Sequence, residues 1–188
     1  MNSNKITRRD FIQKSAAGAA VTIAGTSVIS CSTTKRTATD MVTLGDSGVK
    51  VSRLAMGTGS NGGHVQRTLG QEEFTKVIRY GIERGVTFID TADNYREMPQ
   101  MVNKAIKGLD REKLQIQCKV SPTKYENPAG EIDRLRKDVG TDYFDSFLIH
   151  CVRTADWVES FAKLRDDLLE LKEKQVLRSV GCSLHGLI

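Results

Sequence analysis

The sequence has few of the residues that mark fibrous or disulfide-rich proteins. Among its 188 residues there are only three prolines, one tryptophan and four cysteines, and aromatic residues make up 6%. With 39% hydrophobic residues, this composition excludes a disordered chain, a collagen-like repeat and a disulfide-rich miniprotein. No C-x-x-C pair occurs, so we expect no metal site of the zinc or iron–sulfur type.

The positive charge of the chain is concentrated at its amino terminus. Of the formal net charge of +5, a net +3 comes from residues 1–30, where four basic residues face one acid, and +2 is left for the remainder. A remainder so close to neutrality gives no reason to expect a nucleic-acid partner.

Residues 1–30 have the features of a cleaved export signal. A basic start is followed by the apolar, small-residue run Ser15–Ser30, which is shorter than the ~20 residues that a membrane-spanning helix needs. The segment Thr7–Lys14, TRRDFIQK, closely resembles the twin-arginine export consensus. We therefore expect the twin-arginine export machinery as a partner and no transmembrane anchor.

A candidate lipidation site follows the apolar run. The residues Val-Ile-Ser-Cys at 28–31 resemble a bacterial lipobox, in which Cys31 becomes the lipidated first residue of the mature protein. Val28 and Ser30 differ from the usual residues, so an ordinary cleavage site beside a chance cysteine stays open as the alternative. Residues 31–40 are polar and threonine-rich, which predicts a tether. We expect a periplasmic protein or a membrane-anchored lipoprotein, whose one membrane contact is the lipid.

From Met41 onward, short apolar runs alternate with amphipathic stretches. Residues 42–44 and 49–51, around a glycine-bounded turn, predict a β-hairpin. Five further apolar runs predict strands at 54–57, 86–89, 114–118, 144–149 and 176–181. Four stripes of helical spacing predict helices between them: Phe74, Val77, Ile78, Gly81 and Ile82; Met98, Met101, Val102, Ala105 and Ile106; Ile132, Leu135 and Val139; and Phe161, Leu164, Leu168 and Leu171.

The ends of the five predicted strands recur at a nearly constant spacing of about 30 residues, at Gly57, Asp90, Lys119, His150 and Ser183. This spacing indicates parallel strands with crossover helices, either an open doubly wound sheet or a (β/α) barrel. Residues 57–62 match G-x-G-x-x-G, but the loop up to about residue 70 is too long to lead directly into a pyrophosphate-binding helix. We therefore favour an α/β fold of the (β/α)8 TIM-barrel type.

Four ionisable residues follow the predicted strands, namely Asp90, Tyr95, Lys119 and His150. Since parallel strands end at one face, we expect these side chains to share one mouth, although each alone could be a solvent-facing strand end. The Lys119 ammonium would lower the pKa of Tyr95, Asp90 would hold Lys119, and His150 would orient a substrate oxygen. Together, these four side chains can protonate a carbonyl oxygen while a nicotinamide supplies hydride to the carbonyl carbon.

These residues carry a resemblance to the aldo-keto reductase family, NADPH-linked (β/α)8 barrels that reduce aldehydes and ketones. The matching segments are Leu44–Gly57, Phe88–Tyr95, Cys118–Val120 and Asp142–His150. The resemblance implies a catalytic tetrad of Asp90, Tyr95, Lys119 and His150, with Tyr95 as general acid. It also implies NADP(H) as cofactor, a small-molecule carbonyl substrate, and cofactor contacts from Gly57, Asp90 and Ser183.

Other positions near the predicted mouth are less certain in role. Trp157 and His185 are candidates for lining the substrate mouth, with packing as the alternative for Trp157. Arg96 stands where the family usually has glycine, and Leu184 stands where many members have asparagine. We expect the cysteines beside the strand ends, Cys118, Cys151 and Cys182, to be small packing residues.

The length sets a limit on the barrel. A complete (β/α)8 barrel needs ~250 residues, so we expect residues 41–188 to form an incomplete one, with a hairpin and about five of the eight βα units. Two exposed sheet edges and an uncovered inner face would follow, and the family's loop for the NADP 2′-phosphate would be missing. We therefore expect little turnover from this chain alone. A non-catalytic interaction module and an inactive truncated gene product stay open as alternatives.

Overall fold

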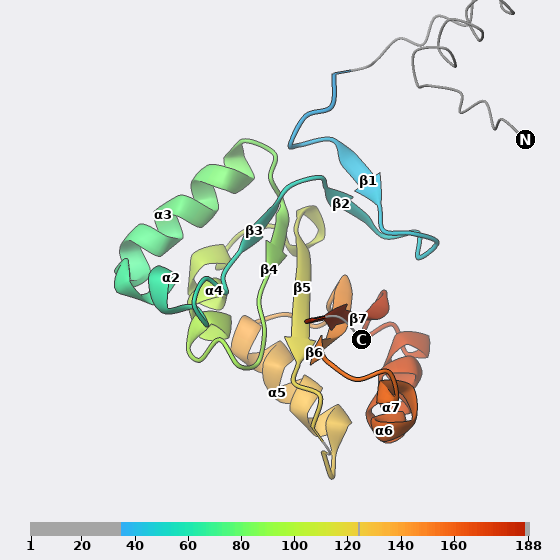
Figure 1. The fold of residues 1–188 in the computed structure, drawn as a ribbon. Coiled ribbons are helices and arrows are strands. Elements are labelled where there is room, and N and C mark those ends of the chain that lie inside the picture. Colours follow the sequence, from blue (N-terminus) through green and yellow to red (C-terminus); the bar gives the residue numbers. More distant parts are fainter. Residues whose placement is uncertain (1–34, 124, 187–188) are drawn as a thin grey trace, which may run out of the picture. The chain divides into compact units, whose positions relative to one another are not determined.

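A computed structural model of the chain describes residues 35–123 and 125–186 (Figure 1). The expected export signal and Cys31 lie outside these described residues. In the described ranges, none of the helices has the length and apolar character needed to cross a bilayer.

The predicted hairpin is present. Strands β1 (Met41–Thr43) and β2 (Lys50–Ser52) pair antiparallel, which confirms the prediction to within a residue. The buried Ser52 fastens this hairpin to the sheet, because its Oγ accepts the N–H groups of Thr87 and Phe88 at 3.1 and 3.0 Å. The hairpin therefore closes one end of the strand assembly.

The folded unit begins slightly before the predicted boundary at residue 41. The carbonyl of Ala38 accepts the N–H of Leu54, and the carbonyl of Asp40 accepts the N–H of Arg53, both at 2.9 Å. Asp40 also pairs with the Arg53 guanidinium at 3.4 Å. The last residues of the predicted 31–40 tether thus belong to the fold.

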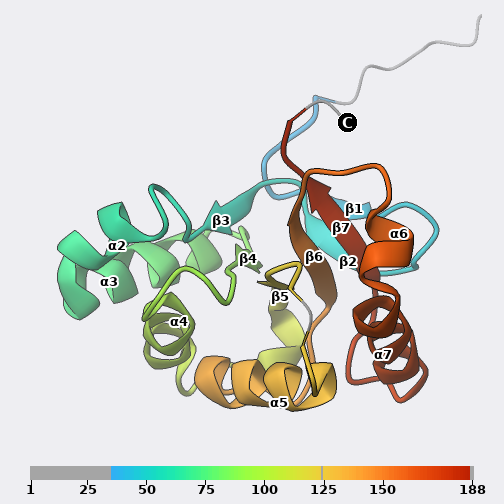
Figure 2. The ribbon, with the colours of Figure 1, turned by 60° about the horizontal axis from the view of Figure 1, so that its bottom comes forward.

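Five parallel strands form one sheet in chain order. They are β3 (Ala55–Gly57), β4 (Phe88–Asp90), β5 (Gln115–Val120), β6 (Ser146–Val152) and β7 (Val180–Leu184). The helices are α2 (His64–Thr68), α3 (Gly70–Glu83), α4 (Met98–Ile106), α5 (Pro128–Val139), α6 (Trp157–Ser160) and α7 (Ala162–Glu173), with a 3₁₀ turn η2 at Arg111–Lys113. Figure 2 shows α3, α4, α5 and α7 in an arc along the outer side of the strands. The predicted α/β fold is confirmed, and this arc corresponds to part of a (β/α)8 barrel.

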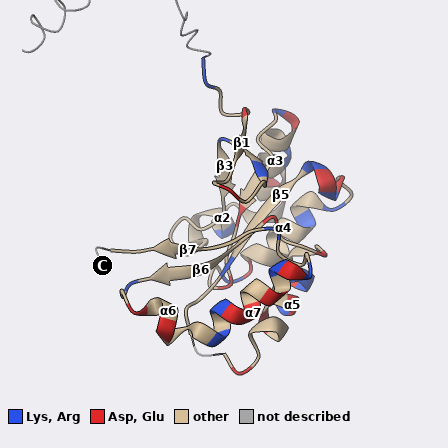
Figure 3. Ribbon diagram, turned by 90° about the vertical axis from the view of Figure 1, so that its right-hand side faces the viewer, with Lys and Arg blue, Asp and Glu red and all other residues tan. Residues whose placement is uncertain are grey.

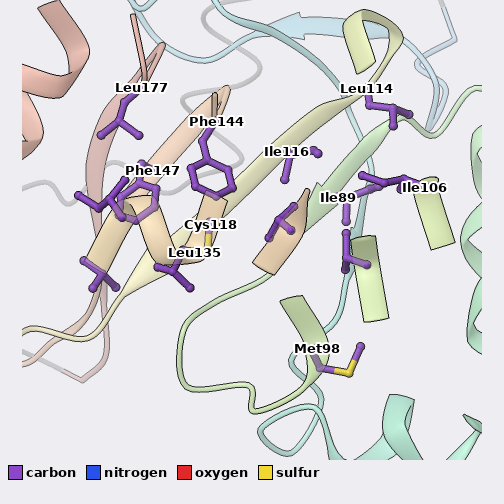
Figure 4. Close-up of a cluster of buried hydrophobic side chains, with 14 of the residues drawn as sticks. Ile89, Met98, Ile106, Leu114, Ile116, Cys118, Leu135, Phe144, Phe147 and Leu177 are labelled. Carbon is purple, nitrogen blue, oxygen red and sulfur yellow. The ribbon is translucent and has the colours of Figure 1, made fainter. Parts of the chain in front are cut away.

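The hydrophobic core lies between the sheet and its outer helices (Figure 4). Along β5 the fully buried Ile116, Cys118 and Val120 belong to this core, and the residues between them face the inner side of the arc. Cys118 packs in the core as predicted. Charged residues are spread along α5 and α7, whereas the strands are largely uncharged (Figure 3). Inner-face charges are therefore few, and they need a specific reason.

Several element boundaries differ from the predictions. Helix α2 interrupts the loop expected between residues 57 and 70; it buries none of its residues, so it leaves no apolar periodicity to detect. Val77, predicted in the buried stripe of α3, is 56% exposed. The buried face of α3 is instead formed by Phe74 and Ile78, which lie four residues apart.

Strands β5, β6 and β7 also run past their predicted ends. Lys119 and His150 are followed by one and two further strand residues, so they lie on the inner face rather than at the strand tip. Leu177, predicted within the fifth strand, forms only an isolated bridge with Phe144. Ser183 consequently lies inside β7 instead of closing it.

Candidate active site

The structure brings the four predicted tetrad residues together on the inner side of the sheet. Lys119 Nζ donates to Asp90 Oδ1 at 2.5 Å and lies 5.3 Å from the centroid of the Tyr95 ring. The rings of Tyr95 and His150 meet edge to face, with centroids 5.6 Å apart and an interplanar angle of 83°. Asp90, Lys119 and His150 come from β4, β5 and β6, and Tyr95 comes from the loop after β4.

The Asp90–Lys119 pair is almost removed from solvent, with side-chain exposures of 21% and 8%. Lys119 Nζ also donates to the carbonyl of Thr91 at 3.1 Å. Gln117 Nε2 donates to Asp90 Oδ1 at 2.6 Å, and Gln117 Oε1 accepts the Ser146 hydroxyl at 2.9 Å. These bonds meet the requirement that buried charges be paired and hydrogen-bonded. Gln117 was missed in the sequence, although its spacing of two from Lys119 places it on the same face.

The loop that carries Tyr95 is held by hydrogen bonds to three other segments of the chain. The buried Thr58 donates both its N–H and its hydroxyl to the carbonyl of Asp90, at 3.0 and 2.9 Å. Arg67 Nη1 donates to the carbonyl of Tyr95 at 3.2 Å. Asp93 Oδ2 accepts the N–H of Ser121 at 2.8 Å. Tyr95 is thus held by a preorganised loop, and Thr58 and Arg67 are positioning residues that no sequence pattern indicated.

Gly59 lies directly against the Tyr95 ring. A Cβ at this position would come within 2.6 Å of the Tyr95 hydroxyl oxygen and closer still to two ring carbons. Real structures essentially never show such contacts, so any side chain at residue 59 must displace the ring or the glycine-rich loop. This close approach explains a glycine that the dinucleotide-motif reading did not.

Gly59→Ala is expected to lower kcat by about 100-fold for a reaction in which Tyr95 takes part, because a displacement of about 1 Å at a reacting group can reduce the rate that much. We expect the midpoint of thermal unfolding to change little, since the loop can shift outward. The control is Asn94→Ala, in the Tyr95 loop with an exposed side chain, which should keep its rate within a few-fold. Equal rates for Gly59→Ala and wild type would show that Tyr95 placement is unimportant.

The electrostatic expectation for Tyr95 is wrong in sign. Burial, with the Asp90 carboxylate as the next contributor, raises the pKa of Tyr95 from 10.0 to about 12. The Lys119 charge does not reverse this shift, because that ammonium is already neutralised by its contact with Asp90. The Tyr95 hydroxyl is therefore fully protonated at neutral pH.

Burial also favours the uncharged form of His150. It is 4% exposed, and burial, followed by the nearby Lys119 charge, lowers its pKa from 6.5. Within residues 35–123 and 125–186 its Nδ1 atom has no hydrogen-bond partner. A neutral imidazole carries one N–H donor, which suits it to hold a carbonyl oxygen.

The other predicted site residues differ in where they lie. Ser183 and His185 join the site: Ser183 Oγ accepts the N–H of Cys151 at 2.9 Å, and the His185 ring lies 6.2 Å from that of His150. Gly57 ends β3 beside open space. Trp157 instead packs against the hydrophobic core, in line with its packing alternative.

Arg96, next to Tyr95, has a strained backbone conformation. Its φ of +54° lies in the left-handed region, which glycine adopts freely and which costs other residues about 1–2 kcal/mol. A glycine at this position would adopt the same conformation without that cost.

Comparison with known proteins places the chain in a family. Residues 53–187 match the model of the Aldo/keto reductase family. A probable aldo-keto reductase 1 of Glycine max is 32% identical over 158 residues, covering 76% of this chain and 44% of the relative. The glycerol 2-dehydrogenase (NADP(+)) of Saccharomyces cerevisiae is 28% identical over 107 residues, covering 56% and 31%.

Solved structures agree with this assignment. An aldo/keto reductase from Brucella melitensis superposes with a TM-score of 0.62 at 26% identity, covering 79% of this chain and 55% of that one. The chain spans less than half the length of the curated relatives it matches. The family match and the tetrad geometry together show that this chain belongs to the aldo/keto reductase family.

Proposed function

We propose that this site reduces the carbonyl group of an aldehyde or ketone to an alcohol, with Tyr95 as proton donor and NADPH as hydride source, and that the assembled tetrad gives this chain low but measurable turnover, against which the variants are compared. The observation that carries the proposal is the position of Tyr95, enclosed by the His150 ring edge, the Lys119 ammonium and Gly59. His150 and Lys119 lie beside the Tyr95 ring and Gly59 lies against its hydroxyl, so the proton donor has a defined position, as general acid catalysis requires.

The residues of the chain account for the proton. As negative charge develops on the carbonyl oxygen, the Tyr95 hydroxyl donates its proton there, and the His150 N–H holds the same oxygen. A pKa of about 12 does not prevent this transfer, because an alkoxide is a stronger base than a phenolate. Lys119, held by Asp90, lies 5.3 Å from the centroid of the Tyr95 ring and helps to fix the position of that ring.

The residues present fit a nicotinamide. Ser183 Oγ accepts a backbone N–H and so retains its own hydrogen for a carboxamide oxygen. Gly57 borders open space in which a planar ring could lie. A bound nicotinamide would supply the hydride. The NADP(+) in the name of the related yeast dehydrogenase supports the choice of cofactor.

The pH dependence of reduction tests the state of Tyr95. Because the acid form is active and its pKa is about 12, kcat should stay constant from about pH 7 to about pH 10 and fall only beyond that. The sign follows from the role: an acid is lost as pH rises through its pKa. A pH profile of NADPH consumption with an excess of aldehyde measures it. A decline centred at about pH 8 would mean that another group donates the proton.

We also propose that the protein is exported by the twin-arginine route and anchored through Cys31. The support is the TRRDFIQK segment and the lipobox-like residues 28–31. Cell fractionation tests this proposal, with Arg8→Lys/Arg9→Lys as the export variant and Cys31→Ser as the lipidation variant. Full-length wild-type protein in the cytoplasm would overturn it.

A further inference from the structure

Three ligand-bearing side chains converge at one end of β6 and β7. His150, Cys151 and His185 each offer one ligand atom, and these atoms all lie within 4.8 Å of one another. In the part of the chain that the structure describes, no other three of His, Cys, Asp or Glu come together in this way. His150 is buried, Cys151 is half-buried and His185 is exposed, so the cluster opens to solvent on one side.

The convergence depends on a break in the β6 backbone. Neighbouring residues of a regular strand point to opposite faces, which would separate the His150 and Cys151 side chains. Cys151 has a φ of +58°, and the β6–β7 register shifts between Ile149 and Val152. Such a bulge re-aims a side chain. Here it brings the Cys151 thiol to the side of its neighbour.

Two bonds across the bulge fix this arrangement. Ser183 Oγ accepts the Cys151 N–H, and the carbonyl of Val152 accepts the His185 N–H, both at 2.9 Å. The backbone of β7 is thereby locked to the irregular part of β6, where Figure 2 shows the two strands side by side. His185 cannot drift from Cys151 without breaking that bond.

A second observation points to a ligand. His150 is 4% exposed, yet its Nδ1 has no hydrogen-bond partner among the described residues. Buried polar atoms are nearly always satisfied, so an unsatisfied one calls for an explanation. Two imidazoles and one thiolate form a ligand set that suits Zn²⁺, and a three-ligand set leaves the fourth tetrahedral position open.

We propose that His150, Cys151 and His185 form a binding site for Zn²⁺ at the mouth of the active site. On binding, the Cys151 thiol releases its proton to solvent, and the thiolate and two neutral imidazoles coordinate the ion. The three ligand atoms lie within 4.8 Å of one another, and rotation of the exposed His185 side chain would bring them to the closer spacing that bonds of about 2.0–2.3 Å to Zn²⁺ require. This proposal departs from the sequence-based expectation of no zinc site, which rested on the absence of a C-x-x-C pair; here two of the ligands are adjacent residues of β6, and His185 directly follows β7.

The site has a functional consequence that rests on the proposed reductase activity. Coordination removes the His150 imidazole from the position where it would hold the substrate oxygen, and places a cation beside Tyr95. Zn²⁺ therefore acts as a reversible inhibitor that competes with the carbonyl substrate.

The direct test is titration of the full chain with Co²⁺, a spectroscopic substitute for Zn²⁺. We expect a thiolate-to-cobalt charge-transfer band that saturates at about one equivalent and disappears when Zn²⁺ is added. Cys151→Ser should abolish the band. His185→Gln should weaken Co²⁺ binding by about 100-fold. Since His185 is exposed, that second variant stays informative if the first fails to fold.

Matched controls separate this site from other thiols. Cys182→Ser and Cys31→Ser, each at a cysteine outside the proposed ligand set, should leave the band unchanged. A band that survives Cys151→Ser, or that Cys182→Ser or Cys31→Ser removes, would overturn the proposal.

The inhibitory role has a separate readout. Zn²⁺ should inhibit NADPH consumption by wild type, a chelator should restore it, and Cys151→Ser should resist inhibition. A protein that binds Co²⁺ through Cys151 but shows no reduction at all would contradict the proposed reductase activity and leave the metal site standing.

Discussion

Replacing Tyr95 with phenylalanine is expected to lower kcat for carbonyl reduction by about 10²–10⁴-fold, the usual contribution of a positioned general acid. The substitution removes only the hydroxyl. The ring still fills the space between Gly59 and His150, so KM for the aldehyde and the midpoint of thermal unfolding should change little. Steady-state rates at saturating NADPH measure the effect.

Tyr125→Phe is the matched control for this prediction. Tyr125 is half-buried, and its hydroxyl donates to Asp93 Oδ2 at 3.3 Å, so it is a second tyrosine that is hydrogen-bonded next to the site but lies outside the tetrad. Its loss should change kcat by no more than a few-fold. If Tyr95→Phe and Tyr125→Phe lose activity equally, the proton does not come from Tyr95.

Asp145→Ala is expected to lower the free energy of unfolding by about 1–3 kcal/mol, the cost of leaving a buried hydrogen-bonding group without its partner. The Asp145 side chain is 2% exposed and accepts bonds from Arg111 and Arg178 at 2.8 and 2.9 Å. It also accepts the N–H of Ile116 at 2.9 Å, in the middle of the strand assembly. The substitution therefore leaves the Ile116 N–H without its acceptor and removes the ion-pair partner of the two guanidinium groups.

Urea denaturation measures this loss, and Asp142→Ala is the control. Asp142 precedes Asp145 by three residues but is exposed, so its side chain should contribute within about 0.5 kcal/mol. If Asp145→Ala lowers the free energy of unfolding by less than about 1 kcal/mol, water replaces the carboxylate as acceptor for Arg111, Arg178 and the Ile116 N–H. Asp145 does not touch the tetrad, so activity should follow the folded fraction.

Much of the fold could be predicted because its elements have strong periodicity. Helix α4 begins at Met98 and ends at Ile106 as the apolar stripe indicated, with Pro99 in its first turn. The hairpin was found from its turn residues. Helix α2 and the start of β7 could not be found in this way. Helix α2 buries none of its residues, and Leu177 is fully buried before the strand begins.

The residues of the candidate site could be proposed from the sequence, but the pKa of Tyr95 and the orientation of Cys151 could not. Alternation along parallel strands was enough to place Asp90, Lys119 and His150 on one face. The raised pKa of Tyr95 depends on burial by the loop containing Gly59, which is a tertiary contact. The turn of Cys151 toward its neighbour depends on a bulge. Neither has a signature in the local sequence.

In the proposed reaction, this tetrad protonates a carbonyl oxygen while hydride arrives from NADPH. Incubating the full chain with an aldehyde and NADPH deuterated at both C4 positions, followed by mass spectrometry of the alcohol, tests it most directly. We predict one deuterium on the carbinol carbon with wild type, and at most about 1% of that amount with Tyr95→Phe. No deuterated alcohol from wild type, or equal amounts from both proteins, would contradict the account.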